Sequence, residues 1–283
     1  GPVRGVMNIS ATDIPASRIT SQTVLNQRRE KRVIMAVICL VLLTLVAWSV
    51  QVTIIEDTDW ERLGGIAKVW DSTSRFIGLD IALFPKLIEP AIETLMIASL
   101  GTLLGVFICI PAAWFGALNI TPFKPVTYPI ARMMMTLSRS IHEIVWALFF
   151  VAAVGLGALA GIFAIAVRSV GFIAKMSAEA IEDIDPGPVE AIRAVGGNGF
   201  QVMIYAILPQ ILPQVLGVII FEWEINIRRS AILGLVGAGG LGLVFFRQMN
   251  TFNFHGVMSV IAAILILILI GEALSHWVRR SII

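Results

Sequence analysis

The stretch Val33–Ile55, VIMAVICLVLLTLVAWSVQVTII, decides the class of fold, because it contains no charged side chain. A helix needs about 20 apolar residues to cross the ~30 Å hydrocarbon core of a bilayer, and this stretch is long enough. It is also too long for the apolar part of a signal peptide, and no small-residue cleavage site follows it. We therefore predict a helix that stays in the membrane. The basic residues just before it are Arg28, Arg29, Lys31 and Arg32.

The composition extends this prediction to the whole chain of 283 residues. Hydrophobic residues make up 57% and charged residues only 14%, with a mean hydropathy of +0.88. Soluble domains carry about 25% charged residues, so a soluble fold of this length would lack polar surface. The net charge of +2 is too small to indicate nucleic-acid binding. Cys39 and Cys109 fall in apolar runs, which indicates neither a disulfide framework nor a metal site.

Five further apolar runs follow, and the six together predict an all-α bundle of six transmembrane helices. We expect residues 1–32 to form a cytoplasmic N-terminal segment, in which 1–6 precede Met7 like the remnant of a cleaved tag. Residues 33–283 are then one membrane domain. The later predicted spans are Ala91–Ala117 (broken at Pro111), Ile130–Val154, Leu156–Ala178, Ile207–Ile227 and Gly256–Val278. The glycine pairs that predict close helix packing are Gly101/Gly105 and Gly157/Gly161.

The basic residues set the orientation of these helices. Arg28–Arg32 before the first span and Arg279–Arg280 after the last both indicate the cytoplasm by the positive-inside rule. Six spans agree with this, because an even number places both termini on one side. The predicted cytoplasmic loops are 118–129 and 179–206, and the predicted outer segments are 56–90 and 228–255. The first outer segment holds Trp60, Trp70 and Phe76 among charged residues, which predicts an amphipathic helix at the interface.

The second predicted cytoplasmic loop holds a short motif. It reads Glu190-Ala191-Ile192-Arg193-Ala194-Val195-Gly196, followed after nine residues by Ala206-Ile207-Leu208-Pro209. Pro186 and Pro188 are tolerated in a first helical turn, and Gly196 with Gly197 favours a helix end. Glu190 then lies near a helix N-terminus, where a carboxylate is favoured. The loop is predicted to contain one short helix between two membrane spans.

This spacing resembles the signature of bacterial ABC importer permeases, which reads Glu-Ala-Ala, three residues, Gly, nine residues, Ile-x-Leu-Pro. Ile192 replaces the second alanine and Ala206 the isoleucine, while the other positions fit. The resemblance implies the type I permease fold and a coupling helix that docks onto an ATPase subunit. The residues that it assigns to this coupling are Glu190, Ala191, Gly196, Leu208 and Pro209.

Three further segments resemble the phosphonate-type permeases of that family, so that the resemblance extends roughly over residues 92–280. The resemblance implies import of phosphonate, phosphite or a related phosphorus oxyanion. Arg168-Ser169 departs from the His-Thr of that subfamily, which leaves the identity of the cargo open. A permease of the same architecture for methionine or another small solute is the alternative. The three segments are Arg139–Glu143, Ser177–Glu182 and Arg228–Gly242.

The fifth predicted span suggests an anion path independently of the resemblance. Glu222, Asn226 and Arg229 occur at i, i+4 and i+7, which places them on one helix face. Charges inside spans are costly and usually face the bundle interior, and arginine offers a planar fork to oxyanions. Alternatively, these charges only neutralise one another and fix the helix register. The candidate path residues are Arg229, Arg228, Asn226, Glu222, Arg139 and Arg168.

Two further groups of residues near this path carry predictions of their own. Arg139, His142 and Glu143 are predicted to share one face of the third span, and Glu224 with Arg228 forms an i, i+4 pair. The run Gly237–Gly242 matches G-x-G-x-x-G by letter, but no strand precedes it, so a dinucleotide site is excluded. Irregular backbone lining a cavity is the better interpretation. The candidate gate residues are Gly237, Gly239 and Gly240.

The sequence contains no G-x-x-x-x-G-K-[ST] phosphate loop, so we expect a transport subunit without its own ATPase site or cofactor. The resemblance implies alternating access in the bacterial inner membrane. The two rival classes are a secondary transporter and an intramembrane enzyme. A secondary transporter would show an internal repeat, which this sequence lacks. An intramembrane enzyme would need a catalytic cluster, but His142, His255 and His276 are scattered along the chain. The implied partners are ATPase subunits binding ATP and Mg, a periplasmic or lipid-anchored substrate-binding protein, a second copy of this chain and membrane lipids.

Overall fold

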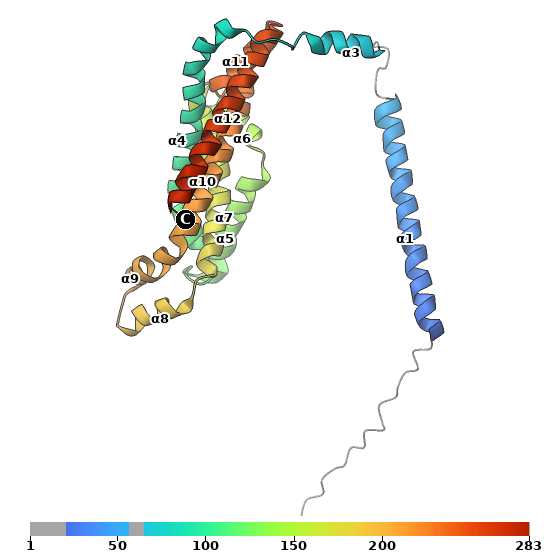
Figure 1. The fold of residues 1–283 in the computed structure, drawn as a ribbon. Helices are drawn as coiled ribbons and strands as arrows, with labels where there is room; N and C mark the ends of the chain where they lie inside the picture. Colours follow the sequence, from blue (N-terminus) through green and yellow to red (C-terminus); the bar gives the residue numbers. More distant parts are fainter. Residues whose placement is uncertain (1–20, 57–64, 283) are drawn as a thin grey trace, which may run out of the picture. The chain divides into compact units, whose positions relative to one another are not determined.

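A computed structural model describes residues 21–56 and 65–282, and these residues form helices joined by short turns, with no strand (Figure 1). The chain divides into two compact units, residues 1–70 and residues 71–283. The prediction of an all-α chain is confirmed for the described residues.

The first unit is dominated by one long helix. α1 (Ser21–Val50) continues into the π-helical turn η1 (Gln51–Glu56), and together they contain the predicted span Val33–Ile55. Every described side chain from 29 to 56 is exposed, as expected of an apolar helix that meets lipid. α3 (Gly65–Ser74) lies in the predicted amphipathic segment and spans the division between the units. Trp60 lies outside the described residues.

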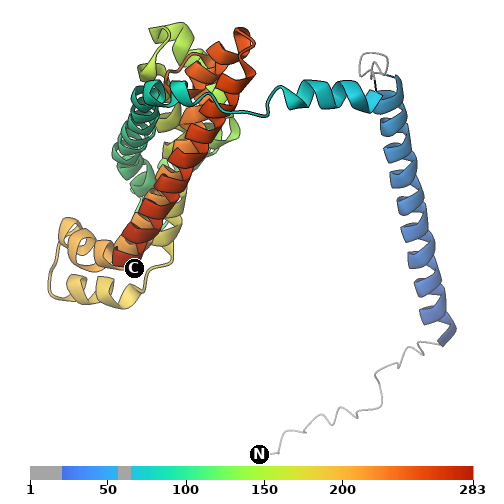
Figure 2. The ribbon, with the colours of Figure 1, turned by 45° about the horizontal axis from the view of Figure 1, so that its top comes forward.

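The second unit is a bundle of long helices with short helices at both ends (Figure 2). α8 and α9 lie together at the ends of α7 and α10, and α11 lies at the opposite end of the bundle. Its helices are η2 (Ile81–Leu83), α4 (Phe84–Gly116), α5 (Lys124–Ser140), α6 (Glu143–Val154), α7 (Ala158–Glu182), α8 (Pro186–Ala194), α9 (Gly199–Val202), η3 (Met203–Ile207), α10 (Leu208–Leu233), η4 (Gly234–Val236), α11 (Gly240–Asn250) and α12 (Phe254–Ile282).

The described residues contain five helices that are long and apolar enough to cross a membrane, and a sixth span if one bent pair counts as one. The bent pair corrects the sequence prediction. Ile130–Val154 is not a single helix, because α5 and α6 meet at an angle of 92°. Ile141 and His142 have extended backbone, and His142 Nδ1 accepts a hydrogen bond from the Ile144 N–H. A new helix therefore begins at Glu143, with His142 as its N-cap.

The prediction at Pro111 was also wrong. α4 continues through both Pro90 and Pro111 to Gly116, so neither proline breaks the span. Membrane helices tolerate proline where neighbouring groups satisfy the freed carbonyls. The fifth span also continues beyond Ile227 to Leu233, which places Arg228 and Arg229 inside the helix rather than in an outer loop.

Small residues bring α4 and α7 close together. A side chain added at Gly101 would strike Ile165, and one at Gly105 would strike Ser169 and Ala166. Gly161 of α7 likewise packs against Ile97 of α4. The predicted close packing is therefore confirmed at these three positions. Gly157 differs: it has no such neighbour and forms a turn with a φ of +139°.

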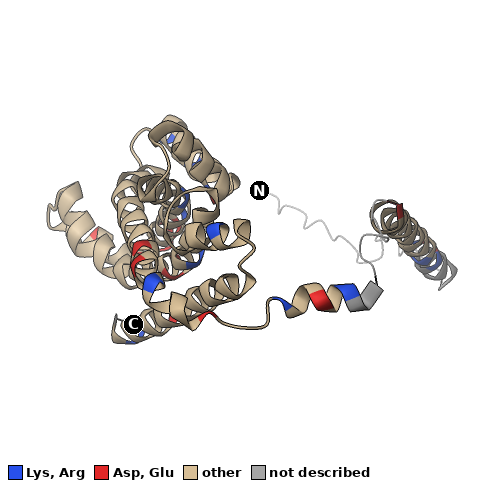
Figure 3. Cartoon of the chain, turned by 90° about the horizontal axis from the view of Figure 1, so that it is seen from above, with Lys and Arg blue, Asp and Glu red and all other residues tan. Residues whose placement is uncertain are grey.

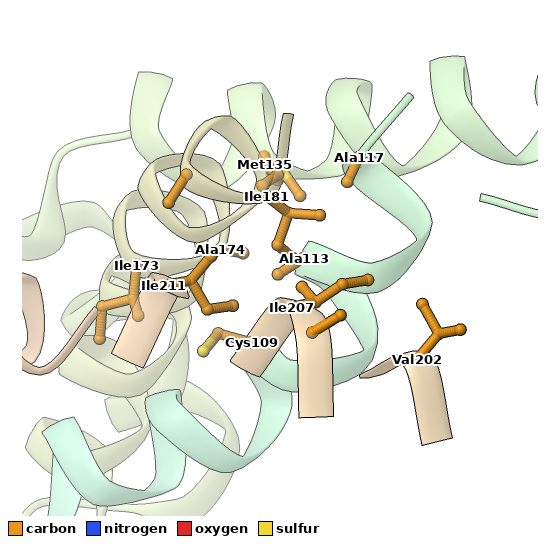
Figure 4. Packing of buried hydrophobic residues seen from close by; sticks show 13 residues of the cluster. Cys109, Ala113, Ala117, Met135, Ile173, Ala174, Ile181, Val202, Ile207 and Ile211 are labelled. Atoms are coloured by element: carbon orange, nitrogen blue, oxygen red, sulfur yellow. The ribbon is translucent and has the colours of Figure 1, made fainter. Parts of the chain in front are cut away.

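The core beside α5 and α10 is rich in alanines and isoleucines and draws on α4, α5, α7, α9, η3 and α10 (Figure 4). Ala113 and Cys109 of α4 meet Met135 of α5, Ile173 of α7 and Ile211 of α10. Because most of these side chains are small, the helices approach closely and the packing itself holds the bundle.

An arginine in the middle of α5 fastens the ends of α4 and α7 at the α8 side of the bundle. Arg132 of α5 donates from Nε to the Gly116 carbonyl at the end of α4, at 2.8 Å. Its Nη2 donates to Glu182 Oε1 of α7 at 2.8 Å, and the Leu118 N–H donates to the same carboxylate oxygen. A cation near the carbonyls of a helix C-terminus is favourable, so this cluster fixes α4, α5 and α7 to one another.

Candidate functional site

Seven polar side chains from four helices meet inside the bundle. Their exposure is low: Glu222 is 1% exposed, and Asn226 and Ser169 are fully buried. Seen from above, Figure 3 shows acidic and basic residues on the helices of the bundle. We call these residues the central polar cluster: Thr102 of α4, Glu143 of α6, Arg168 and Ser169 of α7, and Glu222, Asn226 and Arg229 of α10.

α10 supplies the centre of the cluster. Arg229 Nη1 donates to Glu222 Oε1 at 2.6 Å and to Asn226 Oδ1 at 3.0 Å. Residues at i, i+4 and i+7 share a helix face, and the predicted alignment of these three side chains is confirmed. Because Arg229 and Glu222 are oppositely charged and lie close together, the hydrogen bond between them belongs to the strong, charge-assisted class.

Neighbouring helices satisfy the remaining groups on this face. Asn226 Nδ2 donates to Thr102 Oγ1 at 2.9 Å and to Ser169 Oγ at 2.8 Å. Ser169 Oγ in turn donates to Glu222 Oε1 at 3.2 Å. The buried carboxylate of Glu222 therefore has two donors, as a charged group in a low-dielectric interior requires. Sequence reasoning missed Thr102 and Ser169, since a single hydroxyl in an apolar run carries no pattern.

Glu143 connects the two arginines. Its Oε1 lies 3.6 Å from Arg229 Nε, and its Oε2 lies 3.7 Å from Arg168 Nε. Arg168 Nη1 is buried and has no hydrogen-bond partner among the described residues. Two arginines thus face two glutamates, so that the charges balance within the cluster. Sequence reasoning placed Glu143 among the charges of the third span but did not connect it to Arg168 or Arg229.

The structure separates other residues predicted to lie together. Because the helix breaks after Ser140, Arg139 ends α5 while Glu143 begins α6, so the predicted shared face is wrong. Arg139 is exposed. Arg228 donates to Glu224 Oε1 at 2.7 Å, and Glu224 Oε2 accepts from Ser275 of α12. The predicted i, i+4 pair is confirmed, and it lies on a different face of α10 from Arg229.

The loop between α7 and α10 forms the predicted short helix. Asp185 Oδ1 caps α8 by accepting from the Gly187 N–H at 2.9 Å. Gly196 ends the helix with a φ of +85°, and the Gly197 N–H donates to the Ile192 carbonyl. Glu190 and Ala191 are exposed on α8, and Leu208 and Pro209 begin α10.

A second short helix and three exposed apolar side chains complete this loop. Asn198 and Gln201 cap α9 reciprocally, at 2.8 and 2.9 Å. Val195 is 82%, Phe200 73% and Tyr205 67% exposed. Exposed apolar side chains gathered in one loop indicate a contact surface for another protein or for lipid.

The glycine run is held at the opposite end of the bundle. Glu93 Oε2 accepts from the Gly240 N–H at 3.0 Å, and Thr94 Oγ1 accepts from the Leu241 N–H at 2.8 Å. Gly237, Gly239 and Gly240 all have positive φ. The backbone is therefore irregular from Gly237 to Gly239, after which α11 begins with Gly240 as its first residue. A gating role for these glycines stays a prediction.

Comparison with known proteins places this arrangement in a family. Residues 105–283 match the model of the binding-protein-dependent transport system inner membrane component. The phosphite transport system permease protein of Stutzerimonas stutzeri is 35% identical over 218 residues, which cover 77% of this chain and 79% of that protein. The phosphate-import permease protein of Mycolicibacterium smegmatis is 39% identical over 202 residues, 71% of this chain but only 38% of that protein.

The fold has a solved counterpart. The inward-facing MetNI methionine ABC transporter contains a chain that superimposes with a TM-score of 0.64, at 22% identity, over 72% of this chain and 100% of that one. The described helices therefore have the arrangement of an ABC importer permease. The fold and the family match agree. The chain belongs to the inner-membrane components of binding-protein-dependent transport systems, which are the multi-pass permease subunits of ABC importers and whose ATPase is a separate subunit.

Proposed function

We propose that this permease translocates phosphonate, phosphite or a related phosphorus oxyanion by alternating access. The observation that carries the proposal is the pair of arginines in the central polar cluster, held inside the bundle by α7 and α10. The two relatives are named for phosphite transport and for phosphate import, and these names support the same class of cargo. The path in this proposal comprises Arg168, Arg229, Asn226 and Glu222.

Guanidinium groups suit this cargo for geometric reasons. A planar fork of N–H donors matches the oxygens of a phosphorus oxyanion, and the interaction is stronger away from bulk water. Arg168 Nη1 offers a buried donor without a partner among the described residues. Such a donor is costly unless something satisfies it, and an oxygen of the cargo would do so.

The full transporter in this proposal contains two copies of the chain, two ATPase subunits that bind ATP and Mg, and a periplasmic or lipid-anchored binding protein. Both termini lie in the cytoplasm, with residues 33–283 as the membrane domain and the loop 179–206 as the coupling loop. The exposed Val195 and Phe200 of that loop support an ATPase contact, because no other described part of the bundle covers these apolar side chains.

Reconstituted uptake tests the cargo. Liposomes containing the permease, its ATPase and its binding protein are supplied with ATP inside, and the uptake of phosphite and of methionine is compared. We expect ATP-dependent phosphite uptake at least about tenfold above methionine uptake, since two arginines suit a phosphorus oxyanion but repel the ammonium group of methionine. Methionine uptake without phosphite uptake would instead favour the amino-acid permease.

Phe200→Ser tests the coupling loop. Buried interface aromatics contribute about 1–3 kcal/mol, so we expect uptake and substrate-stimulated ATPase activity to fall at least about tenfold. The bundle should assemble normally, because Phe200 is 73% exposed. Phe123→Ser is the matched control: it makes the same change at an 82% exposed phenylalanine in the other predicted cytoplasmic loop. Equal losses in both variants would count against a specific ATPase contact at Phe200.

A further inference from the structure

Glu143 occupies an unusual position in the central polar cluster. It is the first residue of α6, directly after the 92° bend between α5 and α6. Its carboxylate lies between Arg168 and Arg229, which come from two other helices. The rest of α6 packs through its one fully buried residue, Ala147, and through the partly buried Ile144, Trp146 and Phe150. The contacts of Glu143 therefore tie the beginning of α6 to α7 and α10.

The two glutamates of the cluster are held very differently. Glu222 is 1% exposed and accepts from Arg229 at 2.6 Å and from Ser169 at 3.2 Å. Glu143 lies 3.6 and 3.7 Å from the arginine nitrogens, beyond the distance of a strong charge-assisted hydrogen bond. The side chain of Glu143 is also 12% exposed. Glu222 is thus a fixed partner of Arg229, whereas Glu143 is a loosely held one.

We propose that Glu143 is an exchangeable internal counterion: it occupies the space between Arg168 and Arg229 while no cargo is bound, and a phosphorus oxyanion displaces it. This inference rests on the proposed function. The oxyanion brings at least three oxygens where the carboxylate brings two, and the additional oxygen reaches Arg168 Nη1, which has no hydrogen-bond partner in the described part of the chain.

The exchange is electrostatically balanced. Removing one partner of a buried ion pair leaves a charge uncompensated, at a cost of about 3–5 kcal/mol. When an anion enters as Glu143 leaves, neither arginine is left without a negative partner. The binding site can therefore release its cargo without leaving bare arginines inside the membrane. The displacement also frees the beginning of α6, which links occupancy of the site to movement of that helix.

Direct binding measurements test the exchange. The complex of permease and ATPase subunits is placed in nanodiscs and titrated with inorganic phosphite, without ATP and without the binding protein. Glu143→Gln keeps the size of the side chain and removes the competing charge. We expect it to bind phosphite about tenfold more tightly than the wild type, a common size of coupling between two groups that compete. Unchanged or weaker binding by an assembled variant would overturn the proposal.

Glu224→Gln is the matched control, because Glu224 is also paired with an arginine but on a different face of α10. We expect wild-type affinity for phosphite in this variant. An equal rise in both variants would reveal a general charge effect and would also overturn the proposal.

If Glu143→Gln does not assemble, a second measurement tests whether phosphite displaces Glu143. His142→Cys places a thiol at a 64% exposed position next to Glu143, in a background of Cys39→Ser and Cys109→Ala. Phosphite should change the labelling rate of this thiol severalfold, because release of Glu143 frees the beginning of α6. An unchanged labelling rate at saturating phosphite would contradict the displacement.

The arginine variants separate this inference from the proposed function. If Arg168→Gln and Arg229→Ala lose phosphite binding while Glu143→Gln leaves it unchanged, the counterion role is wrong and the oxyanion path stands. If none of the three variants alters phosphite binding or uptake, the oxyanion path is wrong as well.

Discussion

Arg229→Ala is expected to abolish phosphite uptake. The substitution removes one of the two arginines that face the proposed path, and it also removes the 2.6 Å partner of Glu222. A buried carboxylate that loses its partner destabilises a fold by about 3–5 kcal/mol. Uptake by reconstituted liposomes and the yield of assembled protein should therefore both be measured, because either effect alone would lower transport.

A double variant separates the two effects. Arg229→Ala combined with Glu222→Gln removes the unpaired charge, so we expect assembly to recover while uptake remains lost. Arg228→Ala provides a comparison at the neighbouring arginine, whose partner Glu224 faces α12 rather than the cluster. Its effect on uptake should be smaller than that of Arg229→Ala. Normal uptake by an assembled Arg229→Ala protein would rule out a role of this arginine in the path.

The α10 part of the site could be predicted from the sequence because it depends on one helix alone. Glu222, Asn226 and Arg229 share a face by helical spacing, and the structure confirms their hydrogen bonds. Thr102, Glu143 and Ser169 come from other helices, far away in the sequence. Their contacts depend on how α4, α6 and α7 pack against α10, and no local pattern encodes that packing.

The bend between α5 and α6 shows why the spans themselves were only partly predictable. Polar residues do interrupt the apolar run here, as Ser138–Glu143 reads SRSIHE, but no proline or glycine marks the break, and the polar residues fit one face of a continuous helix equally well. The break depends instead on the extended backbone of these two residues and on the capping of α6 by His142. Pro111 is the opposite case: a strong breaker in the sequence lies inside a continuous helix, because the packed bundle overrides local propensity.

The short helix α8 between α7 and α10 was predictable for a third reason, which is that its signals are all local. Pro186, Asp185 and Gly196 each act within one helical turn, as first-turn residue, N-cap and helix end. The glycine run near Gly237 was predictable only as irregular backbone. Its anchoring by Glu93 and Thr94 joins residues 147 positions apart and needed the structure.

Gly242→Ala is expected to destabilise the bundle by about 3 kcal/mol or more, since overpacking against backbone atoms cannot be relieved by a side-chain rotation. An added Cβ at Gly242 would lie far inside contact distance of the Ala231 carbonyl oxygen and close to the Cα of Gly234. Both neighbours are backbone atoms: Ala231 lies in the last turn of α10, and Gly234 begins η4, which leads toward α11. The yield of assembled protein and its thermal unfolding temperature in detergent measure the effect.

Gly199→Ala is the control, because it makes the same substitution at a glycine where the added side chain would not clash. An added Cβ there meets nothing within 4 Å, and Gly199 is the first residue of helix α9. Because alanine favours a helix over glycine by up to about 1 kcal/mol, we expect unchanged or slightly higher stability. A Gly242→Ala protein as stable as Gly199→Ala would show that the turn between α10 and α11 can open, as a gate beside the path would require. A large loss confined to Gly242→Ala would instead mark this turn as a rigid part of the permease rather than as a gate.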